Sequence, residues 1–357
     1  MTTLKTVLVF VLILISLDSI ADTSPGENID IVRAVSFGGI EAKPGKKVSG
    51  FIMVPAGVDE GTRIPVSVIH GVKPGPVLAL IAGTHGYEYA PIIALQKIRA
   101  DLDPKGLSGT VVIVHIANMP SFLGRTIYRS PIDGKNLNRQ YPGNKEGTVS
   151  ERIAYAITTG IIAKSDYVID MHAGDGNEAL RPYIYMPKTG DAEFDETIQN
   201  MAMAFGIDHI IIDRAEISEF GAATFTDATA LSLGKPAMTT ETGQLGLTSA
   251  EWTDIAETGV WNLLRHLDMV EGENQPVAPI VWLGRYEVIN SPGTGIFKPL
   301  VKDGYMVAEG GRLGELVDFF GEKVADIKAP FKGVVNYIVT TPPISEGEPV
   351  AMVSELE

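Results

Sequence analysis

The sequence predicts an α/β fold, in which helices cover a mixed central sheet, followed by a small all-β domain at the C-terminus. Between residues 77 and 269, short continuous apolar runs alternate with longer helix-like segments. Such runs are typical of strands that are buried on both faces of a sheet. From residue 280 onward, Gly and Pro are frequent, the Val/Ile runs are short and no helix is convincing, which indicates a separate β domain.

Composition excludes several classes of protein. The chain has 357 residues, with 44 acidic groups, 29 basic groups, 6 His and no Cys, and its formal net charge is -15. A chain of this length can bury roughly 75% of its unfolded surface, and its length suggests about two domains. The acidic balance argues against a nucleic-acid partner, which requires clustered Lys and Arg. The absence of Cys excludes disulfide scaffolds, Cys-rich zinc modules and thiol nucleophiles.

The first 21 residues have the pattern of a cleaved export signal. Lys5 precedes an apolar run that ends near Leu17, and the small residues Ser19 and Ala21 follow two apart. The run is shorter than the roughly 20 residues that a membrane-spanning helix requires. We therefore expect a periplasmic or secreted protein without stable membrane association after cleavage. The alternative is an uncleaved N-terminal anchor.

Composition and the pattern of apolar runs divide the remaining chain into a β-rich lead-in, an α/β domain, a polar linker and the C-terminal β domain. Pro91 is expected at the first position of its helix, and Ser150 at the N-cap of another. The four segments are residues 22–76, 77–270, 271–279 and 280–357. Strands are expected at 77–82, 110–117, 167–171, 209–213 and 236–240, and helices at 91–102, 150–164 and 250–269.

Chemically active side chains follow three of the predicted strands. His85 and Glu88 come after strand 77–82, His172 follows strand 167–171, and Glu241 follows strand 236–240. In an open α/β sheet, ligands bind outside the carboxyl ends of the strands. We therefore expect these four side chains to meet at one edge of the sheet.

Two His and one carboxylate form the ligand set of a hydrolytic zinc site with an open fourth position. His85 and Glu88 are three residues apart and can converge on one metal ion, which His172 joins from another strand. Zinc lowers the pKa of a bound water molecule from 15.7 to about 7. A further carboxylate is then needed to move the proton from water to the leaving amine, and Glu241 is the candidate. Residues 77–270 are therefore the expected catalytic domain.

A second group of polar side chains lies in a loop rich in Gly, Pro and Asp. The segment GRTIYRSPIDGKNLNRQYPG at 124–143 places Arg129, Asn138 and Arg139 near one another. The planar guanidinium of Arg suits a carboxylate. A hydrolase that acts on acylated amino acids needs one such anchor for the substrate carboxylate and one for the developing oxyanion.

Four motifs, in order, give the chain a resemblance to a known family. GTHGYE, DGKNLNRQYPG, DMHAG and TTETG resemble the succinylglutamate desuccinylase/aspartoacylase family of zinc carboxypeptidase-like enzymes, over about residues 30–355. The resemblance implies a carboxypeptidase-like α/β domain and one zinc ion per chain. It also implies a C-terminal β domain that partly covers the site, and this segment is similar to a biotinyl/lipoyl-type barrel-sandwich. The implied roles are zinc ligation by His85, Glu88 and His172, proton transfer by Glu241, carboxylate binding by Asn138 and Arg139, and carbonyl polarisation by Arg129.

These observations predict an exported zinc amidohydrolase that removes an acyl group from an N-acyl amino acid or a related small amide. One alternative is a metallocarboxypeptidase or amidase that acts on short or cell-wall peptides. A second alternative is a non-catalytic solute-binding protein with a retained zinc pocket. The acyl group, the amine and the oligomeric state are left open by the sequence.

For several residues near the expected site, the sequence allows two interpretations. Asp170 either orients His172 as a hydrogen-bond acceptor or is a turn residue at the strand end. Glu178 and Arg181 either line the site or are solvated loop charges. Arg139 either binds substrate or pairs with a nearby carboxylate. The other four histidines are expected to be structural: His70, His115, His209 and His266.

Overall fold

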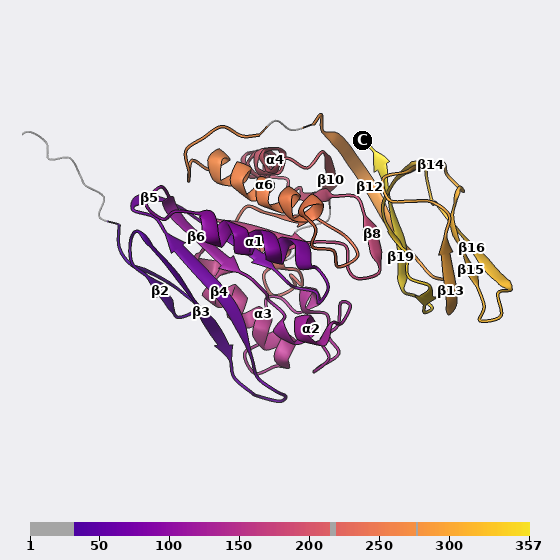
Figure 1. The fold of residues 1–357 in the computed structure, drawn as a ribbon, viewed down its shortest axis with the longest axis horizontal. Coiled ribbons are helices and arrows are strands. Elements are labelled where there is room, and N and C mark those ends of the chain that lie inside the picture. Colours follow the sequence, from indigo (N-terminus) through magenta and orange to yellow (C-terminus); the bar gives the residue numbers. More distant parts are fainter. Residues whose placement is uncertain (1–31, 215–218, 276–277) are drawn as a thin grey trace, which may run out of the picture. The chain divides into compact units, whose positions relative to one another are not determined.

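The computed structural model describes residues 32–214, 219–275 and 278–357 (Figure 1). Residues Val32–Glu357 form one unit. The predicted export signal at 1–21 lies outside the described residues. In the part of the chain that the structure describes, no helix is long and apolar enough to span a membrane.

A 13-stranded mixed sheet runs through the unit. Its central strands β5, β7 and β11 are parallel neighbours, while β9 is antiparallel to β11. The order along the sheet is β14-β17-β19-β12-β10-β9-β11-β7-β5-β6-β4-β3, and β8 pairs with β17. The bounds are β3 Lys46–Val54, β4 Thr62–His70, β5 Lys73–Ala82, β6 Ser108–Val114, β7 Tyr167–His172, β8 Glu178–Leu180, β9 Tyr183–Pro187, β10 His209–Asp213, β11 Ala237–Glu241, β12 Val281–Asn290, β14 Met306–Val307, β17 Gly333–Val339 and β19 Pro349–Leu356. A separate short pair, β1 (Val35–Phe37) and β2 (Ile40–Ala42), precedes them.

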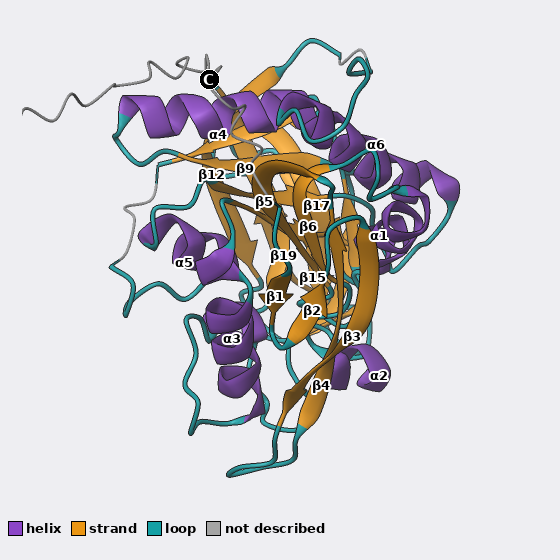
Figure 2. Ribbon diagram, turned by 90° about the vertical axis from the view of Figure 1, so that its left-hand side faces the viewer, coloured by secondary structure: helices purple, strands orange, loops and turns teal. Residues whose placement is uncertain are grey.

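Helices cover both faces of the central strands, as the continuous apolar runs predict. Helices α1 (Tyr89–Asp101), α4 (Ala192–Phe205) and α6 (Ala250–His266) lie together over one face. Helices α3 (Val149–Gly160) and α5 (Thr226–Ser232) lie over the opposite face (Figure 2), and the short α2 (Met119–Gly124) lies beside β4. The sheet is therefore the buried middle layer of three.

Two predicted helix starts are displaced in the structure. Helix α1 begins at Tyr89, so Pro91 is its third residue. Helix α3 begins at Val149 with Thr148 as its N-cap, so the prediction of Ser150 at this position is wrong. The physical reason is the pairing of Thr148 with Glu151, whose Oε2 accepts the backbone N–H of Thr148 at 2.8 Å. A Glu three residues after a Thr satisfies an N–H group that the helix itself cannot.

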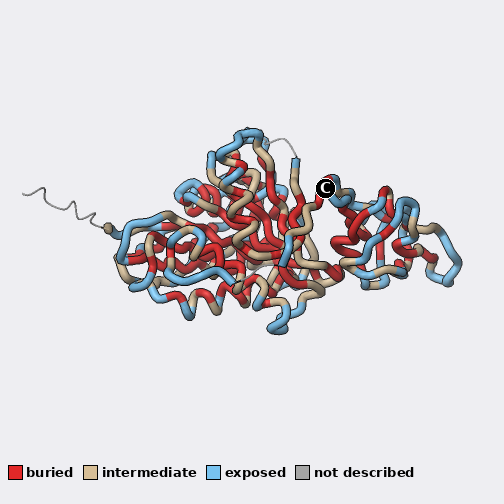
Figure 3. Tube along the Cα trace, turned by 90° about the horizontal axis from the view of Figure 1, so that it is seen from above, coloured by how far each residue is buried: buried red, intermediate tan, exposed pale blue. Residues whose placement is uncertain are grey.

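The C-terminal strands are joined to the central sheet by hydrogen bonds. Strand β12 pairs in parallel with β10 and antiparallel with β19. A second sheet has the order β16-β15-β13-β18, and it packs through a separate apolar core that includes Phe297 and Leu316. Figure 3 shows buried segments within this C-terminal part of the chain. Its strands are β13 Gly295–Pro299, β15 Arg312–Val317, β16 Lys323–Lys328 and β18 Pro343–Ile344. The domain limits at 22–76, 77–270, 271–279 and 280–357 remain a prediction from the sequence.

Helix α6 packs closely on α4 at Gly259. A Cβ atom added there would lie 2.1 Å from Cε1 of Phe205, which is buried in the core. In an exposed helix, Ala is more stable than Gly by about 1 kcal/mol. Here the overlap reverses that preference, because overpacking a core typically costs about 1–3 kcal/mol.

We therefore expect Gly259→Ala to lower the free energy of unfolding by roughly 1–2 kcal/mol, as measured by chemical denaturation. Phe205→Leu in the same chain should recover part of the loss, because it removes the ring that meets the new methyl group. A Gly259→Ala protein as stable as the wild type would contradict this packing.

Candidate active site

Three parallel strands deliver the predicted site residues to one edge of the sheet. His172 ends β7 and Glu241 ends β11, and the two residues are direct partners in the strand register. Strand β5 lies on the other side of β7 and ends at Ala82, immediately before the loop that carries His85 and Glu88. The expectation that all four side chains meet at the carboxyl edge is thus met by the topology.

The loop after β5 folds back against the segment that follows α2. A Cβ atom at Gly86 would lie 2.2 Å from the carbonyl oxygen of Thr126 and 2.6 Å from that of Ser121. Only Gly can occupy this position without moving the backbone. The close approach places His85 and Glu88 beside the loop at 124–143, so the two predicted groups of site residues adjoin each other.

Glu88 lies between two histidine rings. Its Oε1 is 2.5 Å from Nδ1 of His85, and its Oε2 is 2.8 Å from Nδ1 of His172. All three residues are buried, and one ligand atom from each lies within 4.8 Å of the others. Both histidines thus present the same ring nitrogen to one carboxylate.

The opposite nitrogen of each ring is held by an acceptor oxygen. Nε2 of His85 is 3.2 Å from Oδ1 of Asn136, and Nε2 of His172 is 2.9 Å from Oδ2 of Asp170. Such acceptors place the ring proton on Nε2 and leave Nδ1 free to bind a metal ion, as is usual for metal-binding histidines. The cluster therefore fits a divalent metal ion by its donor types, its burial and its supporting hydrogen bonds.

Electrostatics agrees with a cation site. Burial alone would raise the pKa of Glu88, but the adjacent His172 and His85 lower it to about 2. Burial likewise opposes protonation of both histidines, but the neighbouring carboxylates outweigh it and raise the pKa of His85 and of His172. The cluster holds an ionised carboxylate in a buried place, which a positive charge between these groups would stabilise.

Glu241 lies next to this cluster in a different environment. Its Oε2 atom is buried and has no hydrogen-bond partner among the described residues. Burial raises the pKa of Glu241 well above its usual value; His172 opposes the shift, and the carboxylates of Glu88 and Glu178 add to it. A carboxyl group that is buried, unpaired and raised in pKa suits proton transfer.

The loop places Asn138 and Arg139 beside the cluster in different ways. Nδ2 of Asn138 lies 3.4 Å from Nε2 of His172, while its Oδ1 accepts the backbone N–H of Thr226 at 3.0 Å at the start of α5. The guanidinium of Arg139 lies 4.3 Å from the centre of the Phe225 ring and donates to the carbonyl of Asn138. In the described part of the chain it forms no ion pair, so pairing with a nearby carboxylate does not occupy it there.

Arg129 is exposed and its side chain remains within its own loop. Its guanidinium donates to the carbonyl oxygen of Gly134 at 3.1 Å. The preceding residue, Tyr128, contacts the site instead. Its ring lies edge-on to the His85 ring at 5.4 Å, and its hydroxyl donates to Oε1 of Glu178. Tyr128 has a positive φ of 57°, a conformation that is uncommon for a bulky residue and that occurs most often at functional sites.

Two buried acids complete the site and were missed or left open by the sequence. Burial and the nearby Glu88 carboxylate raise the pKa of Asp175 to about 7, and burial raises the pKa of Glu178. Both residues follow closely after His172 in the sequence, and this proximity is the signal that could have indicated them. Arg181 turns away, because its guanidinium pairs with Asp208 at 2.7 Å.

Three of the other four histidines have the structural roles that we expect. His70 bonds to Thr110 and to the carbonyl of Arg33, and His115 bonds to Ser67. His209 lies 2.9 Å from Asp208, and His266 is exposed at the end of α6. None of the contacts described for these residues includes the cluster at Glu88.

Comparisons with known proteins place the chain in a family. The catalytic-domain model of succinylglutamate desuccinylase/aspartoacylase matches residues 74–267. N-alpha-acetyl-L-2,4-diaminobutyric acid deacetylase from Halomonas elongata is 32% identical over 318 residues, covering 86% of this chain and 91% of that protein. The product-bound ectoine utilization protein EutE (DoeB) from Ruegeria pomeroyi is similar in structure, with a TM-score of 0.79 and 28% identity, over 88% of this chain and 96% of that one. An aspartoacylase family protein from Mesorhizobium loti has a TM-score of 0.74 and 29% identity, over 88% and 96% of the two chains.

An α/β sheet that brings two histidines and two glutamates to its carboxyl edge is the framework of a hydrolytic enzyme. The chain belongs to the succinylglutamate desuccinylase/aspartoacylase family, as its motifs predict. It is therefore an enzyme that hydrolyses amide bonds.

The Asp170–His172 bond gives a direct test of the metal site. We expect Asp170→Asn to weaken zinc binding by about 10- to 100-fold, because a neutral amide replaces the charged acceptor of the Nε2 proton and its NH2 group can face Nε2 instead. Zinc affinity would be measured by competition with a chromogenic chelator. Asp208→Asn is the matched control, since it alters an Asp–His bond away from the cluster. Equal affinity for Asp170→Asn and the wild type would contradict the assignment.

Proposed function

We propose that this protein is an exported, zinc-dependent deacylase that removes the acyl group from an N-acyl amino acid or a related small amide. The observation that carries the proposal is the buried cluster of His85, Glu88 and His172. Beside it lies Oε2 of Glu241, which has no hydrogen-bond partner among the described residues. The family model and the deacetylase relative support the deacylase class. Export rests on the pattern of residues 1–21 alone.

In this proposal, one group of residues binds the metal ion and Glu241 transfers the proton. When bound by His85, Glu88 and His172, a zinc ion would lower the pKa of a water molecule and polarise the amide carbonyl. A positive charge held at the cluster would favour the ionised form of Glu241, whose Oε2 would accept a proton from the attacking water and return it to the nitrogen of the leaving amine. The amide is thereby converted to a carboxylic acid and a free amine, and no covalent intermediate with the protein is required.

The substrate carboxylate would bind at Arg139. Its guanidinium is stacked on Phe225 and is oriented by the carbonyl of Asn138, so its planar face is already held in place. Asn138 would assist through Nδ2, because its Oδ1 is already bonded to the start of α5. The proposed role of Arg129 is to polarise the substrate carbonyl. This role requires its guanidinium to break its hydrogen bond to the carbonyl oxygen of Gly134.

Glu241→Gln tests the proton-transfer step. We expect the variant to keep its zinc content and to lose about 10²- to 10⁴-fold in kcat, because the amide cannot carry the proton. Turnover and bound zinc would be measured on the same preparation. Glu251→Gln, an exposed position on α6, is the control and should retain full activity. A Glu241→Gln enzyme with normal turnover would rule out this role.

Arg139→Lys tests carboxylate recognition. Lysine keeps the positive charge but loses the planar pair of donors, so we expect kcat/KM to fall by about 10- to 100-fold, mainly through KM. Steady-state kinetics on an N-acyl amino acid that the wild type hydrolyses would measure this change. Arg214→Lys, whose side chain pairs with Glu357 away from the cluster, serves as the control. An unchanged KM would assign Arg139 a structural role.

The deciding experiment is turnover by the zinc-loaded enzyme on a mixed panel, followed by mass spectrometry. The panel contains N-acyl amino acids, beginning with the N-alpha-acetyl-2,4-diaminobutyric acid for which the Halomonas relative is named, and short peptides. Cleavage of acyl amino acids that is lost on chelation supports the deacylase. Cleavage of peptides alone favours the peptidase, and activity that a chelator leaves unchanged overturns the zinc mechanism.

A further inference from the structure

Asn136 contacts both halves of the candidate site. It is the N-cap of a short 3-10 helix, η1 (Leu137–Arg139), which holds the two residues proposed to bind the substrate carboxylate. Its Oδ1 lies 3.2 Å from Nε2 of His85 and accepts the backbone N–H of Asn138 at 2.8 Å. One oxygen atom therefore joins a proposed metal ligand to the turn that carries the proposed carboxylate-binding residues.

The directions of these two hydrogen bonds follow from the backbone. A backbone N–H group can only donate, so the atom of the Asn136 amide that faces Asn138 is the oxygen. That oxygen has a second lone pair, which can only accept, so the proton of the His85 ring lies on Nε2. Nδ1 of His85 is then the nitrogen that is free for a metal ion, and it faces Glu88 at 2.5 Å. The 3-10 helix thus fixes which nitrogen of His85 can bind a metal ion.

The backbone of Asn136 closes the same turn. Its carbonyl oxygen accepts the N–H of Arg139 at 3.1 Å and Nε2 of Gln140 at 3.0 Å. The guanidinium of Arg139 in turn donates to the carbonyl of Asn138 at 2.7 Å. Asn136 therefore sets the position of Arg139 as well as the orientation of the His85 ring.

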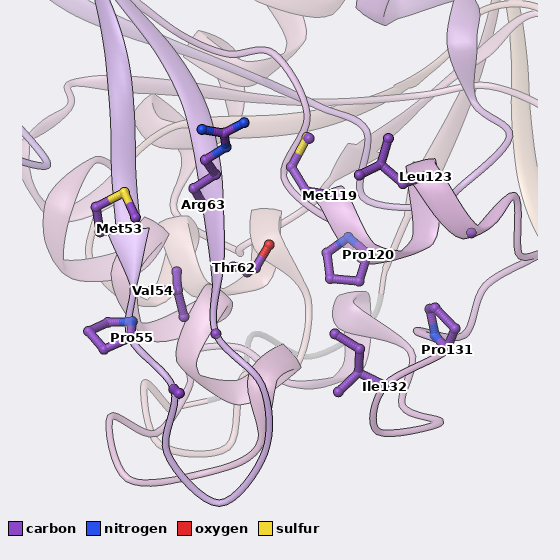
Figure 4. A pocket seen from close by; sticks show the side chains of 13 residues that line it. Met53, Val54, Pro55, Thr62, Arg63, Met119, Pro120, Leu123, Pro131 and Ile132 are labelled. Carbon is purple, nitrogen blue, oxygen red and sulfur yellow. The ribbon is translucent and has the colours of Figure 1, made fainter.

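Contacts away from the metal cluster fix the position of Asn136. Its backbone forms an isolated antiparallel bridge with Arg129. Further along the loop, the carboxylate of Asp133 accepts the N–H of Ser150 at 3.0 Å and its hydroxyl at 2.9 Å at the start of α3. The outer side of the loop, at residues 131–132, lines an open groove between the β3–β4 hairpin and α2 (Figure 4). The loop is thus anchored outside the cluster, and Asn136 carries that fixed position to His85.

The two histidines have acceptors of different charge. Nε2 of His172 faces the carboxylate of Asp170, whereas Nε2 of His85 faces the neutral amide of Asn136. A carboxylate could hold either ring. At position 136, however, it would add a negative charge beside the turn that carries Arg139, and this charge would repel an anionic substrate. A neutral amide therefore suits a residue that serves a metal ligand and a carboxylate-binding residue at once.

We propose that Asn136 is a positioning residue that couples the metal-binding geometry of His85 to the carboxylate-binding geometry of Arg139. The inference rests on the proposed function, because it requires a metal ion at the cluster and a substrate carboxylate at Arg139. Loss of the shared oxygen should therefore impair metal binding and substrate binding together. Loss of a residue that serves only one of them should impair only that one.

Asn136→Leu tests the shared oxygen, because leucine has a similar size but accepts no hydrogen bond. We expect zinc to bind about 10- to 100-fold more weakly. At saturating zinc, KM for an N-acyl amino acid that the wild type hydrolyses should rise by about 3- to 10-fold, the effect of one lost hydrogen bond. Zinc affinity is measured by competition with a chromogenic chelator, which needs no turnover, and KM by steady-state kinetics on the zinc-saturated enzyme.

Asn136→Asp separates position from charge. The carboxylate keeps both acceptor bonds, so zinc should bind at least as tightly as in the wild type, which also shows that the variant folds. KM should nevertheless rise by about tenfold, because the added negative charge repels the substrate carboxylate. Asn144→Ala is the matched control: Oδ1 of this exposed residue accepts the N–H of Glu146 at 3.0 Å, two residues on, in the same pattern. It should change neither quantity.

Four results would overturn the coupling. They are an Asn136→Leu protein with unchanged zinc affinity, the same protein with unchanged KM, an Asn136→Asp protein that binds zinc as weakly as Asn136→Leu, and an Asn136→Asp protein with unchanged KM. Each leaves the proposed deacylase intact, since the wild type still binds zinc and hydrolyses its substrate. A wild type that binds no zinc would instead overturn the proposed function, and this inference with it.

Discussion

The site depends on the parallel pairing of β5, β7 and β11. This pairing places His172 beside Glu241 in register and brings the end of β5 to the same edge. A shift of one residue in the register would turn every side chain of a strand to the other face of the sheet. The buried apolar runs of these strands prevent such a shift, so the hydrophobic core fixes the positions of the polar residues at the edge.

The residues beyond the cluster come from segments far apart in the sequence. The hydroxyl of Tyr128, in the loop after α2, bonds to Glu178 on β8, and β8 pairs with β17 of the C-terminal strands. Glu178 and Tyr128 therefore connect β17 to the His85 ring. Through β8, the C-terminal strands support the loop that carries Tyr128.

The sequence predicts the parts of the site that follow from strand ends and misses those that follow from loop conformation. His85, Glu88, His172 and Glu241 each come directly after a buried apolar run, so position alone indicates where they meet. Tyr128 has no such signal, because its contact with His85 depends on a backbone with positive φ and on the close approach at Gly86. The same limit applies to Ser150, since Thr148 and Ser150 are both good N-cap residues and only the bond to Glu151 distinguishes them.

Two glutamates at one edge acquire different properties from their surroundings. Glu88 lies between two histidines, which hold its pKa at about 2. Burial instead raises the pKa of Glu241, whose Oε2 has no hydrogen-bond partner in the described part of the chain. When environments separate the pKa values of two carboxyl groups in this way, they also assign their roles. The ionised group is suited to hold a cation, and the unpaired group is suited to carry a proton. Strand β7 links the two glutamates, because its last residue, His172, contacts Glu88 through Nδ1 and is the register partner of Glu241.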